Sequence, residues 1–540
     1  MELTRGSEMR SFKLPGCRLT SFVLAAGMLV QAHAGATAAG LSAVVKKRVH
    51  PVLIRNDHNA LLSLTITSDK PFVQMEAVTV SLAGTDDLQD LDSLQFFHGA
   101  ADGRFETIVA FGDRVSAAKT MTFRGHARLK KGTNVFWLSG RLNSNASLAN
   151  RVSASVTRVQ TDTGDAAVSR SAGSGAKRIG VALRRHWDDG VHTYRIPALA
   201  TTTEGTLLCV YDMRRRRRKD LQEDIDIGLM RSTDGGKTWD PQRVIMDMGT
   251  YGGFPQEING VSDPGIIVDP ASGEIFCFGV WMVGKAGKHQ WQGDGSEKGF
   301  EIGKSAQMLM IRSKDDGKTW SKPKNMTRTW KKKDWILYAP SPQQGIALRD
   351  GTLVMPTQGR NENDENFSNL LVSKDHGATW KVSAAASLGN SECQAVELSD
   401  GSIMLNMRTE RSGVFARTVA VTKDLGKSWT PHATNRKALI EPHCNGSLYR
   451  FDYVVDGKKT ALLLFANPYS TSGRHHHSIQ VSMDDGKTWP EKYRMLLDEG
   501  SGAGYPSLSR VDDEHIGIVY EGSQSHVVFE KIAISELLKR

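Results

Sequence analysis

The feature that most constrains the fold is a short box that recurs five times in roughly the last two thirds of the chain. Its pattern is S/T-x-D-x-G-x-S/T-W, and the copies lie at residues 232–239, 313–320, 373–380, 422–429 and 482–489. Each copy follows a short apolar segment that reads as a strand. Units of about 50 to 80 residues, each with four short strands, are typical of propeller blades. Because five marked units leave room for one unmarked unit, the sequence predicts a six-bladed β-propeller over residues 178–540.

The residue types within each box suit a tight turn. An aspartate can accept hydrogen bonds from nearby backbone N–H groups, a glycine adopts positive φ without strain, and a tryptophan fills space between neighbouring sheets. We expect the five box aspartates to be structural, because a single active site cannot use all of them. The repeat therefore predicts a fold and not an activity.

Residues 45–162 form a second unit with a strand-like pattern. Segments rich in Val, Thr and Ile alternate apolar and polar side chains, and turn signals separate them. This pattern predicts an antiparallel β-sandwich, so the whole chain is expected to be all-β. Small and polar residues at 163–177 predict a linker to the propeller. Whether the sandwich is a carbohydrate-binding module or a structural domain stays open.

Residues 1–34 have the composition of a cleavable signal peptide. Four basic residues precede an apolar run at 21–30, and Ala32, His33 and Ala34 follow it. The run is too short to cross a bilayer, which takes about 20 apolar residues. We expect a secreted or periplasmic protein with no integral membrane span, and association with the cell surface is a further option.

The formal net charge of +10 would suit an anionic partner, and the run RRRRRK at 214–219 resembles a nucleic-acid patch. Export makes nucleic acid an unfavourable partner, so none is expected. No metal is expected either, because the cysteines lack ligand spacing and the adjacent His475, His476 and His477 would point to alternating faces of a strand. Cys209 and Cys277 lie in apolar runs and are expected to be buried free thiols.

The segment Tyr194-Arg195-Ile196-Pro197, followed by strands and boxes, resembles the Y/F-R-I-P motif of sialidases. The similarity covers residues 190–525, and the preceding sandwich looks like the domain attached to some bacterial sialidases. The resemblance implies a glycoside hydrolase, an exo-α-sialidase (neuraminidase) that releases terminal sialic acids with retention of configuration. The implied partners are sialylated glycans of glycoproteins, mucins, oligosaccharides and gangliosides, and no cofactor is implied.

Sialic acid carries a carboxylate on its anomeric carbon. A planar, always charged guanidinium suits such an anion better than an ammonium group does. Sialidases use three arginines for this purpose, and the resemblance assigns them to Arg195, Arg408 and Arg474. It also implies that Arg214 contacts the region of the substrate O4. Asp263 matches an acidic residue near O4 and the N-acetyl group.

The catalytic residues also follow from the resemblance. Tyr505 matches the tyrosine that sialidases use as nucleophile, and Glu392 matches the glutamate that takes its proton. A phenol avoids the repulsion that a carboxylate nucleophile would meet from the substrate carboxylate. Asp220 matches the acid/base residue. Glu521 resembles the carboxylate that orients Arg195 through a salt bridge.

Two of these assignments have competitors nearby. Asp220 is followed by three further acidic residues at 223, 224 and 226, so its assignment depends on register. Glu392 shares its predicted strand with Glu397, which is the weaker choice.

Two other functions remain as alternatives. A trans-sialidase or an intramolecular, anhydro-forming sialidase would share the same site residues. A non-catalytic glycan-binding propeller is disfavoured, because it predicts the loss of at least one of Asp220, Glu392 and Tyr505, and all three are present.

Overall fold

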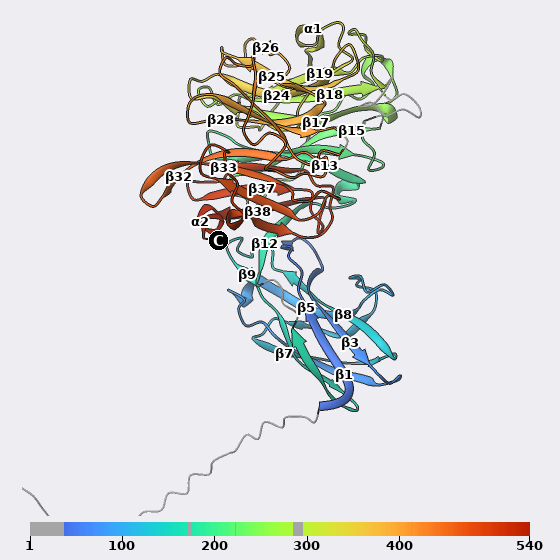
Figure 1. Ribbon diagram of the computed structural model, residues 1–540. Helices are drawn as coiled ribbons and strands as arrows, with labels where there is room; N and C mark the ends of the chain where they lie inside the picture. The colour runs from blue at the N-terminus through green and yellow to red at the C-terminus, as the bar shows by residue number, and fades with distance from the viewer. Residues whose placement is uncertain (1–36, 171–174, 222, 284–294, 412, 540) are drawn as a thin grey trace, which may run out of the picture.

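A computed structural model describes residues 37–170, 175–221, 223–283, 295–411 and 413–539. It has a small N-terminal β domain and a larger propeller, and nearly all regular elements are strands, which confirms the predicted all-β class (Figure 1). The predicted signal peptide lies outside the described residues. Within the described ranges, no helix has the length and apolar character needed to span a bilayer.

The propeller has the predicted six blades. In the first five, four antiparallel strands follow one another along the chain. Blade 1 contains β13 (Thr193–Thr201), β14 (Leu207–Arg214), β15 (Ile225–Ser232) and β16 (Arg243–Met246). Blade 2 contains β17 (Asn259–Val268), β18 (Ile275–Val283), β19 (Gln307–Ser313) and β20 (Lys324–Asn325). Blade 3 contains β21 (Leu337–Pro340), β24 (Leu353–Arg360), β25 (Asn366–Ser373) and β26 (Lys381–Val382). Blade 4 contains β28 (Asn390–Glu397), β29 (Ile403–Thr409), β30 (Thr418–Thr422) and β31 (Thr430–Pro431). Blade 5 contains β32 (Ser447–Val455), β33 (Lys458–Pro468), β34 (His477–Ser482) and β35 (Met495–Asp498).

A few short elements supplement blades 2 and 3. They are the strands β22 (Gln343–Gln344), β23 (Ile346–Ala347) and β27 (Ser387–Leu388) and the one-turn helix α1 (Thr327–Trp330).

The sixth blade is closed by a strand from the other end of the propeller sequence. Its first three strands are β36 (Pro506–Arg510), β37 (His515–Tyr520) and β38 (Val527–Ala533), and β12 (Lys177–Arg184) pairs antiparallel with β38 as the fourth. In the other blades the box forms the turn between the third and fourth strands. Blade 6 lacks that turn because its third and fourth strands are not consecutive, which explains why five boxes mark six blades.

The box at 373–380 shows how the turn is held. Ser373 Oγ donates to Asp375 Oδ1 at 2.8 Å, and the backbone N of Thr379 donates to the same oxygen at 2.8 Å. Gly377 has a φ of 81° and donates its N–H to Ser373 Oγ at 2.8 Å. Hydrogen bonds, above all that from the Thr379 side chain, lower the pKa of Asp375 to about 2. The predicted structural role is confirmed for this aspartate.

The box tryptophans pack against the preceding blade. The ring of Trp380 lies edge-to-face with Phe276 and Phe278 of β18, at centroid separations of 5.7 and 5.6 Å. Trp239 of the first box meets Phe529 of β38 at 5.3 Å. The boxes therefore join neighbouring blades, and one of them joins blade 1 to blade 6.

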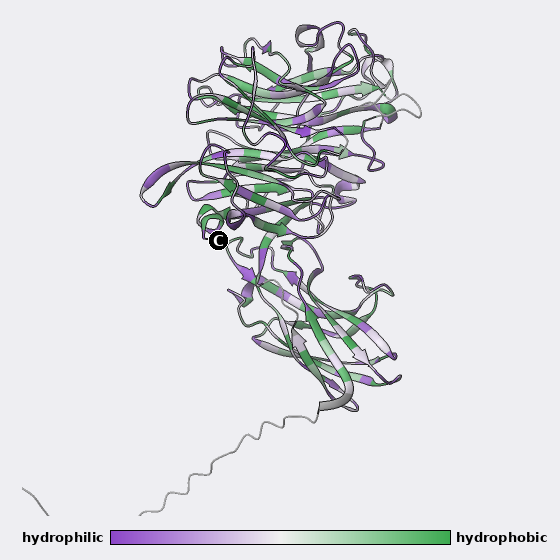
Figure 2. Cartoon of the chain, in the orientation of Figure 1, coloured by the Kyte–Doolittle hydropathy of each residue, from purple (hydrophilic) through white to green (hydrophobic). Residues whose placement is uncertain are grey.

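The N-terminal β domain is a single nine-stranded sheet. Its strands are β1 (Thr37–Lys46), β3 (Asn59–Ser68), β4 (Gln74–Ser81), β5 (Leu91–His98), β6 (Ala110–Ser116), β7 (Thr120–Arg128), β8 (Gly132–Leu142), β10 (Ser155–Thr161) and β11 (Gly164–Arg170). The order is β6-β5-β8-β3-β1-β11-β10-β4-β7, and the edge strands β6 and β7 contact each other. The sheet thus folds into two layers, and Phe96 meets Phe123 across the core at 5.0 Å. Figure 2 shows hydrophobic residues along the strands of both parts.

The predicted linker at 163–177 is wrong over most of its described length. Gly164–Arg170 forms β11, which pairs in parallel with β1 and antiparallel with β10 inside the sheet. The domain also begins before residue 45, because β1 starts at Thr37. Small and polar residues resemble a linker in sequence, but whether such a segment forms a strand depends on its neighbours in the sheet.

Two segments of the N-terminal region extend blade 6. β2 (Val52–Ile54) pairs in parallel with β12, and β9 (Arg151–Val152) pairs antiparallel with the start of β12. Arg151 and Arg178 both form ion pairs with Glu536 of the short helix α2 (Ile534–Leu538). The N-terminal β domain is therefore fixed to one blade by strand pairing as well as by side chains.

Gly377→Ala should lower the melting temperature of the protein by several degrees. The new Cβ would lie 2.1 Å from the Phe276 ring, and a φ of 81° strains any residue other than glycine. Together the overlap and the strain cost about 2 to 4 kcal/mol. Gly401→Ala is the matched control, because it has a φ of 84° and no atom within 4 Å of the new Cβ. Equal melting temperatures for the two variants in scanning calorimetry would contradict the packing role of the box.

Candidate active site

Three of the innermost strands carry an irregularity where the site is formed. The pairing register shifts between Arg195 and Ala198 in β13, between Ser262 and Gly265 in β17, and between Asn390 and Cys393 in β28. Such bulges re-aim side chains and are common beside active sites.

Two of these bulges contain strained backbone. Ile196 and Asp263 have φ values of 55° and 58°, and each is followed by a proline. A residue other than glycine held in this region costs of order 1 to 3 kcal/mol, and such strain concentrates at functional sites. The two bulges turn Arg195 and Asp263 into a common cavity.

The cavity has a volume of about 310 Å³, which is at the small end for a ligand site. It brings together seven of the predicted site residues: Arg195, Asp220, Asp263, Glu392, Arg408, Arg474 and Tyr505. They come from five different blades, and blade 3 supplies further lining residues such as Gln358 and Asn366. Residues up to 310 positions apart in the chain therefore meet around the propeller axis.

Tyr505 contacts several of the charged residues that line the cavity. Its hydroxyl donates a short hydrogen bond to Glu392 Oε1 and accepts one from Arg408 Nη1 at 3.0 Å. The same Arg408 nitrogen donates to Glu392 Oε2 at 2.8 Å. The guanidinium carbons of Arg195 and Arg474 each lie 5.4 Å from the centroid of the tyrosine ring. The phenol is thus surrounded by three cations and one carboxylate.

The surroundings keep this phenol protonated. Burial, and then the charge of Glu392, raise the pKa of Tyr505 well above its ordinary value, while Arg408 and Arg474 oppose the shift. A protonated phenol is a weak nucleophile unless a base takes its proton. The hydrogen bond places Glu392 to be that base.

Glu521 holds Arg195 as predicted and also holds Tyr505. Its Oε1 accepts from Arg195 Nε at 2.6 Å and from the backbone N of Ile196 at 2.7 Å. Its Oε2 accepts from the backbone N of Tyr505 at 3.0 Å, and only 1% of the residue is exposed. The contact with Tyr505 depends on backbone geometry, so no sequence signal could have revealed it.

The other two arginines differ in how far their charge is compensated. Arg408 is paired with Glu392 and, through Nε, with Glu410 at 2.9 Å. Arg474 donates from Nη1 to the carbonyl of Ala503 at 2.8 Å, and no carboxylate of the described residues lies within 4.0 Å of it. Arg474 is therefore the cation best placed to meet an incoming anion.

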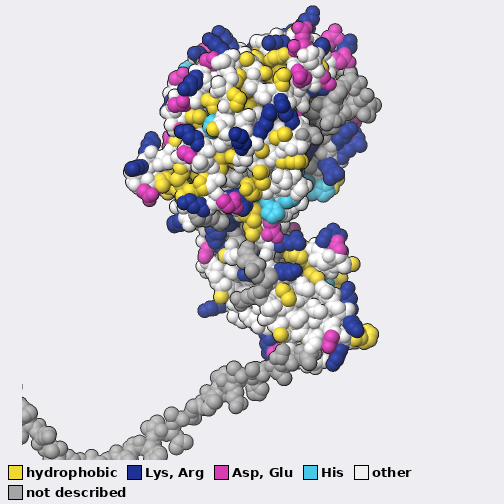
Figure 3. Space-filling view, in the orientation of Figure 1, with side chains coloured by type: hydrophobic (Ala, Val, Ile, Leu, Met, Phe, Trp, Pro, Cys, Tyr) yellow, Lys and Arg dark blue, Asp and Glu magenta, His cyan; other side chains and the backbone are white. Residues whose placement is uncertain are grey.

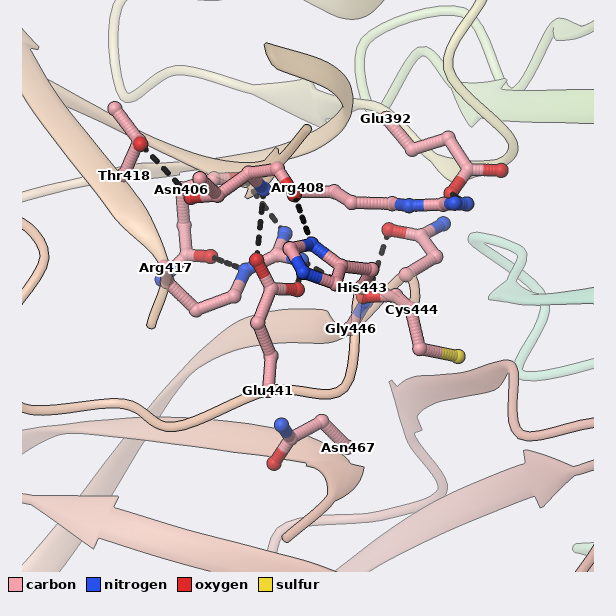
Figure 4. A network of polar contacts seen from close by, with 12 residues as sticks. Glu392, Asn406, Arg408, Arg417, Thr418, Glu441, His443, Cys444, Gly446 and Asn467 are labelled. Carbon is pink, nitrogen blue, oxygen red and sulfur yellow. Dashed lines mark hydrogen bonds and ion pairs between the residues drawn. The ribbon is translucent and has the colours of Figure 1, made fainter. Parts of the chain in front are cut away.

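A buried network supports the strand that carries Arg408 (Figure 4). Arg417 donates to Glu441 at 2.7 Å and to Asn406 at 2.6 Å. Glu441 Oε1 in turn accepts from the backbone N of Thr409, the residue after Arg408, at 2.7 Å. An uncompensated charge here would be very costly, so the pair is expected to be tightly held. Sequence reasoning missed Arg417 and Glu441, because no local motif marks two residues 24 positions apart as a pair.

Arg214 is buried behind Asp220 and is not among the residues that line the cavity. Its Nη1 lies 2.6 Å from Asp220 Oδ1, and its Nε and Nη2 bind Asp212 Oδ2 at 3.2 and 3.0 Å. Asp212, which sequence reasoning missed, also accepts from Ser262 Oγ at 2.6 Å and from the backbone N of Asp263 at 3.1 Å. The structure thus gives Arg214 the task of positioning Asp220, and the predicted contact with the substrate O4 does not follow from this placement.

The competitors of Asp220 are engaged elsewhere. Glu223 pairs with Arg217 at 2.7 Å, and Asp226 pairs with Arg215 at 2.5 Å. Of the four neighbouring acids, Asp220 alone lines the cavity. Four of the five arginines of the run, those at 214–217, therefore pair with nearby acidic side chains. Over the visible face of the propeller as a whole, Figure 3 shows basic and acidic side chains interspersed.

The surroundings of Asp263 disfavour its charged form. Burial raises its pKa well above the ordinary value, and the charges of Asp212, Glu392 and Asp220 raise it further. The protonated form is thereby favoured, and a protonated carboxyl can donate a hydrogen bond to a ligand oxygen.

Other residues considered as ligands lie apart from the site. His477 is buried at the start of β34, while His475 and His476 contact each other in the preceding loop. No cluster of three or more potential metal-ligating side chains occurs in the described part of the chain. Cys209 and Cys277 are buried free thiols, as predicted.

Comparisons with known proteins agree with this architecture. A family model described as a BNR repeat-like domain matches residues 177–520, and one described as the N-terminal domain of BNR-repeat neuraminidase matches residues 41–165. A sialidase of Bacteroides fragilis is 36% identical over 91% of this chain and 94% of its own length. A sialidase of Micromonospora viridifaciens is 34% identical over 62% of this chain and 50% of its own.

The solved structure of Hadza microbial sialidase Hz136 superposes with a TM-score of 0.85 at 33% identity, covering 91% of this chain and 99% of the other. The Trypanosoma rangeli sialidase, at 19% identity and a TM-score of 0.55, shares the fold over 66% of this chain. With both of its domains matched and a relative aligned over nearly the full length, this chain belongs to the family of BNR-repeat sialidases, or neuraminidases.

Proposed function

We propose that the protein is an exo-α-sialidase that hydrolyses terminal sialic acids with retention of configuration, with Tyr505 as nucleophile. The observation that carries the proposal is the contact of the Tyr505 hydroxyl with Glu392 and Arg408 inside a cavity that also holds Arg195, Arg474 and Asp220. The named relatives are sialidases, which supports the substrate class.

The three arginines would bind the substrate carboxylate. Their guanidinium groups lie around the Tyr505 ring, so an anion held by them would place the adjacent anomeric carbon over the phenol oxygen. Arg195 is fixed by Glu521 before any ligand arrives, which reduces the ordering that binding requires.

The reaction then proceeds in two displacements. In the first, Glu392 takes the phenolic proton while the Tyr505 oxygen bonds to the anomeric carbon. The glycosidic bond breaks, and Asp220 gives its proton to the departing oxygen. In the second, Asp220 removes a proton from water, the water oxygen bonds to the anomeric carbon, and Tyr505 leaves with the proton held by Glu392. Two displacements at one carbon give net retention.

Sialylated glycoproteins, mucins, oligosaccharides and gangliosides are the proposed substrates. We place the protein in the periplasm or outside the cell, because residues 1–34 read as a cleavable signal peptide and such glycans are met there.

Incubation with 2,3-difluorosialic acid should leave a covalent sialyl group on Tyr505. A complex of the Trypanosoma rangeli sialidase with this compound is described as a covalent intermediate. Mass spectrometry of the digested protein should place the added mass on the peptide that contains Tyr505. Tyr505→Phe should take up no label, whereas Tyr338→Phe, a buried tyrosine of blade 3, should label like the wild type. A label on any other residue would overturn the assignment, as would full hydrolysis of a sialyl-chromophore substrate by the Tyr505→Phe, Asp220→Ala double variant.

Glu392→Gln should lower kcat on a chromogenic sialoside by about 100-fold or more, because an amide cannot accept the phenolic proton and general-base catalysis contributes about 10² to 10⁴. Glu397→Gln is the control in the same strand, since Glu397 pairs with Arg349 outside the cavity. Steady-state kinetics of both variants would decide between the two glutamates. Equal losses of kcat in Glu392→Gln and Glu397→Gln would contradict the assignment of Glu392 as the base, because the effect would then come from disturbing the strand.

Products from linkage-defined sialyllactoses, followed by NMR, should show the α-anomer of free sialic acid first and the β-anomer later by mutarotation. The α-anomer appears first because two displacements retain the configuration. Initial release of the β-anomer would contradict the tyrosine mechanism. Sialic acid transferred to lactose, or an anhydro product, would assign the protein to the transferring alternatives instead.

A further inference from the structure

A second hollow of about 1030 Å³ adjoins the catalytic cavity. The two share Arg195, Asp220 and Arg474, whereas Tyr505, Glu392 and Arg408 line only the catalytic cavity. Asp220 therefore stands at the boundary between the two spaces, with the nucleophile on one side of it.

That boundary position decides what the hollow can hold. The acid must reach the glycosidic oxygen, which lies between the sialic acid and the rest of the substrate. If the sialic acid occupies the cavity with Tyr505, the next group of the chain must extend past Asp220 into the second hollow.

Three histidines line this hollow and a tryptophan packs against two of them; we call the four side chains the ring cluster: His186, Trp187, His192 and His526. His186 is 4.7 Å from His192 and 5.6 Å from His526 between ring centroids, and Trp187 is 5.0 Å from His192. The three histidines line the hollow, and Trp187 is 53% exposed beside them. An exposed tryptophan packed on two lining histidines presents an apolar surface that nothing in the described chain covers.

The chemistry of the ring cluster fits a neutral sugar. A pyranose has an apolar face of C–H groups, which can lie against aromatic rings, and a rim of hydroxyl groups. Burial lowers the pKa of both His192 and His526, which favours their uncharged forms. Arg217, Arg218 and Lys219 also line the hollow and offer hydrogen-bond donors to hydroxyl groups.

We propose that the ring cluster is the binding site for the first sugar of the leaving group, a neutral hexose such as the galactose of sialyllactose. This inference rests on the proposed function, because it takes Asp220 as the acid. It makes the enzyme selective for sialosides whose aglycone is a sugar.

The N-terminal β domain holds the loop between β12 and β13, which carries three members of the ring cluster, His186, Trp187 and His192; the fourth, His526, lies between β37 and β38. Arg55, which follows β2, donates from Nη1 to the carbonyls of Ala182 and Leu183 at 2.7 and 2.6 Å. Its Nη2 donates to Asp188 Oδ2 at 2.9 Å, and Asp188 lies one residue after Trp187. In the reverse direction, Arg185 Nη1 donates to the Arg55 carbonyl at 2.5 Å. The domain thus acts as a positioning element for the sugar site, which gives it a role that does not require it to bind glycans itself.

The test compares kcat/KM for 3′-sialyllactose with kcat/KM for α-sialyl fluoride, whose leaving group carries no sugar. Trp187→Ala should lower the ratio of the two kcat/KM values by about 10-fold. This is the effect expected when one aromatic contact with the substrate, and the area that it buries, is lost. Trp187→Phe should restore most of the ratio. Phe72→Ala is the matched control, because Phe72 is an exposed aromatic residue at positive φ in the N-terminal β domain, and it should keep the wild-type ratio.

Arg55→Ala should lower the same ratio although Arg55 lies outside the hollow. Arg48→Ala is its control, because Arg48 also reaches across the domain junction but pairs there with Glu499, which is not part of the loop. Melting temperatures of all variants would separate a local effect from a general loss of folded protein.

The outcomes are distinct. An unchanged ratio for Trp187→Ala would overturn the sugar site, and so would an equal loss on both substrates, which would mean that the ring cluster supports the catalytic centre. A reduced ratio for Trp187→Ala with an unchanged ratio for Arg55→Ala would keep the sugar site and overturn the role of the N-terminal β domain. A wild-type protein inactive on both substrates would instead overturn the proposed function.

Discussion

One buried carboxylate, that of Glu521, connects Arg195 and Tyr505, whose relative position the proposed reaction depends on. It accepts hydrogen bonds from the Arg195 side chain, from the backbone of Ile196 in blade 1, and from the backbone of Tyr505 beside blade 6. Because one acceptor serves both blades, the first arginine and the tyrosine cannot shift independently. The same contact spans the seam where β12 completes the ring, so the precision of the site depends on closure of the propeller.

Much of the fold could be predicted because the box is a local device. A serine, an aspartate and a glycine within five residues form the turn by themselves, so each copy reports its own blade. The site residues Arg195, Glu392 and Tyr505 could be assigned because each lies in a recognisable segment of a family pattern. Asp220 was ambiguous among four acids until the structure placed the other three outside the cavity.

The rest depends on contacts between distant parts of the chain. Arg214 could not be placed behind Asp220 from sequence, because its position is set by Asp212 and, through it, by Ser262 and Asp263 of the next blade. The strand β11 was mistaken for a linker, since its small residues acquire a partner only when β1 lies beside them. The contact of Arg55 with Asp188 joins residues 133 positions apart and leaves no mark in either segment.

The closure of blade 6 by β12 has a consequence for the order of assembly. β12 is made early and β38 almost last, with the five boxed blades between them. During synthesis, the edge of β12 that later pairs with β38 therefore stays unpaired until the last blade is made, and long-range pairing of this kind is slow and prone to aggregation. β2 and β9 precede β12 in the chain and pair with it, so they can hold it as a strand during the delay. The N-terminal region is therefore placed to keep β12 in its strand conformation until β38 pairs with it and closes the propeller.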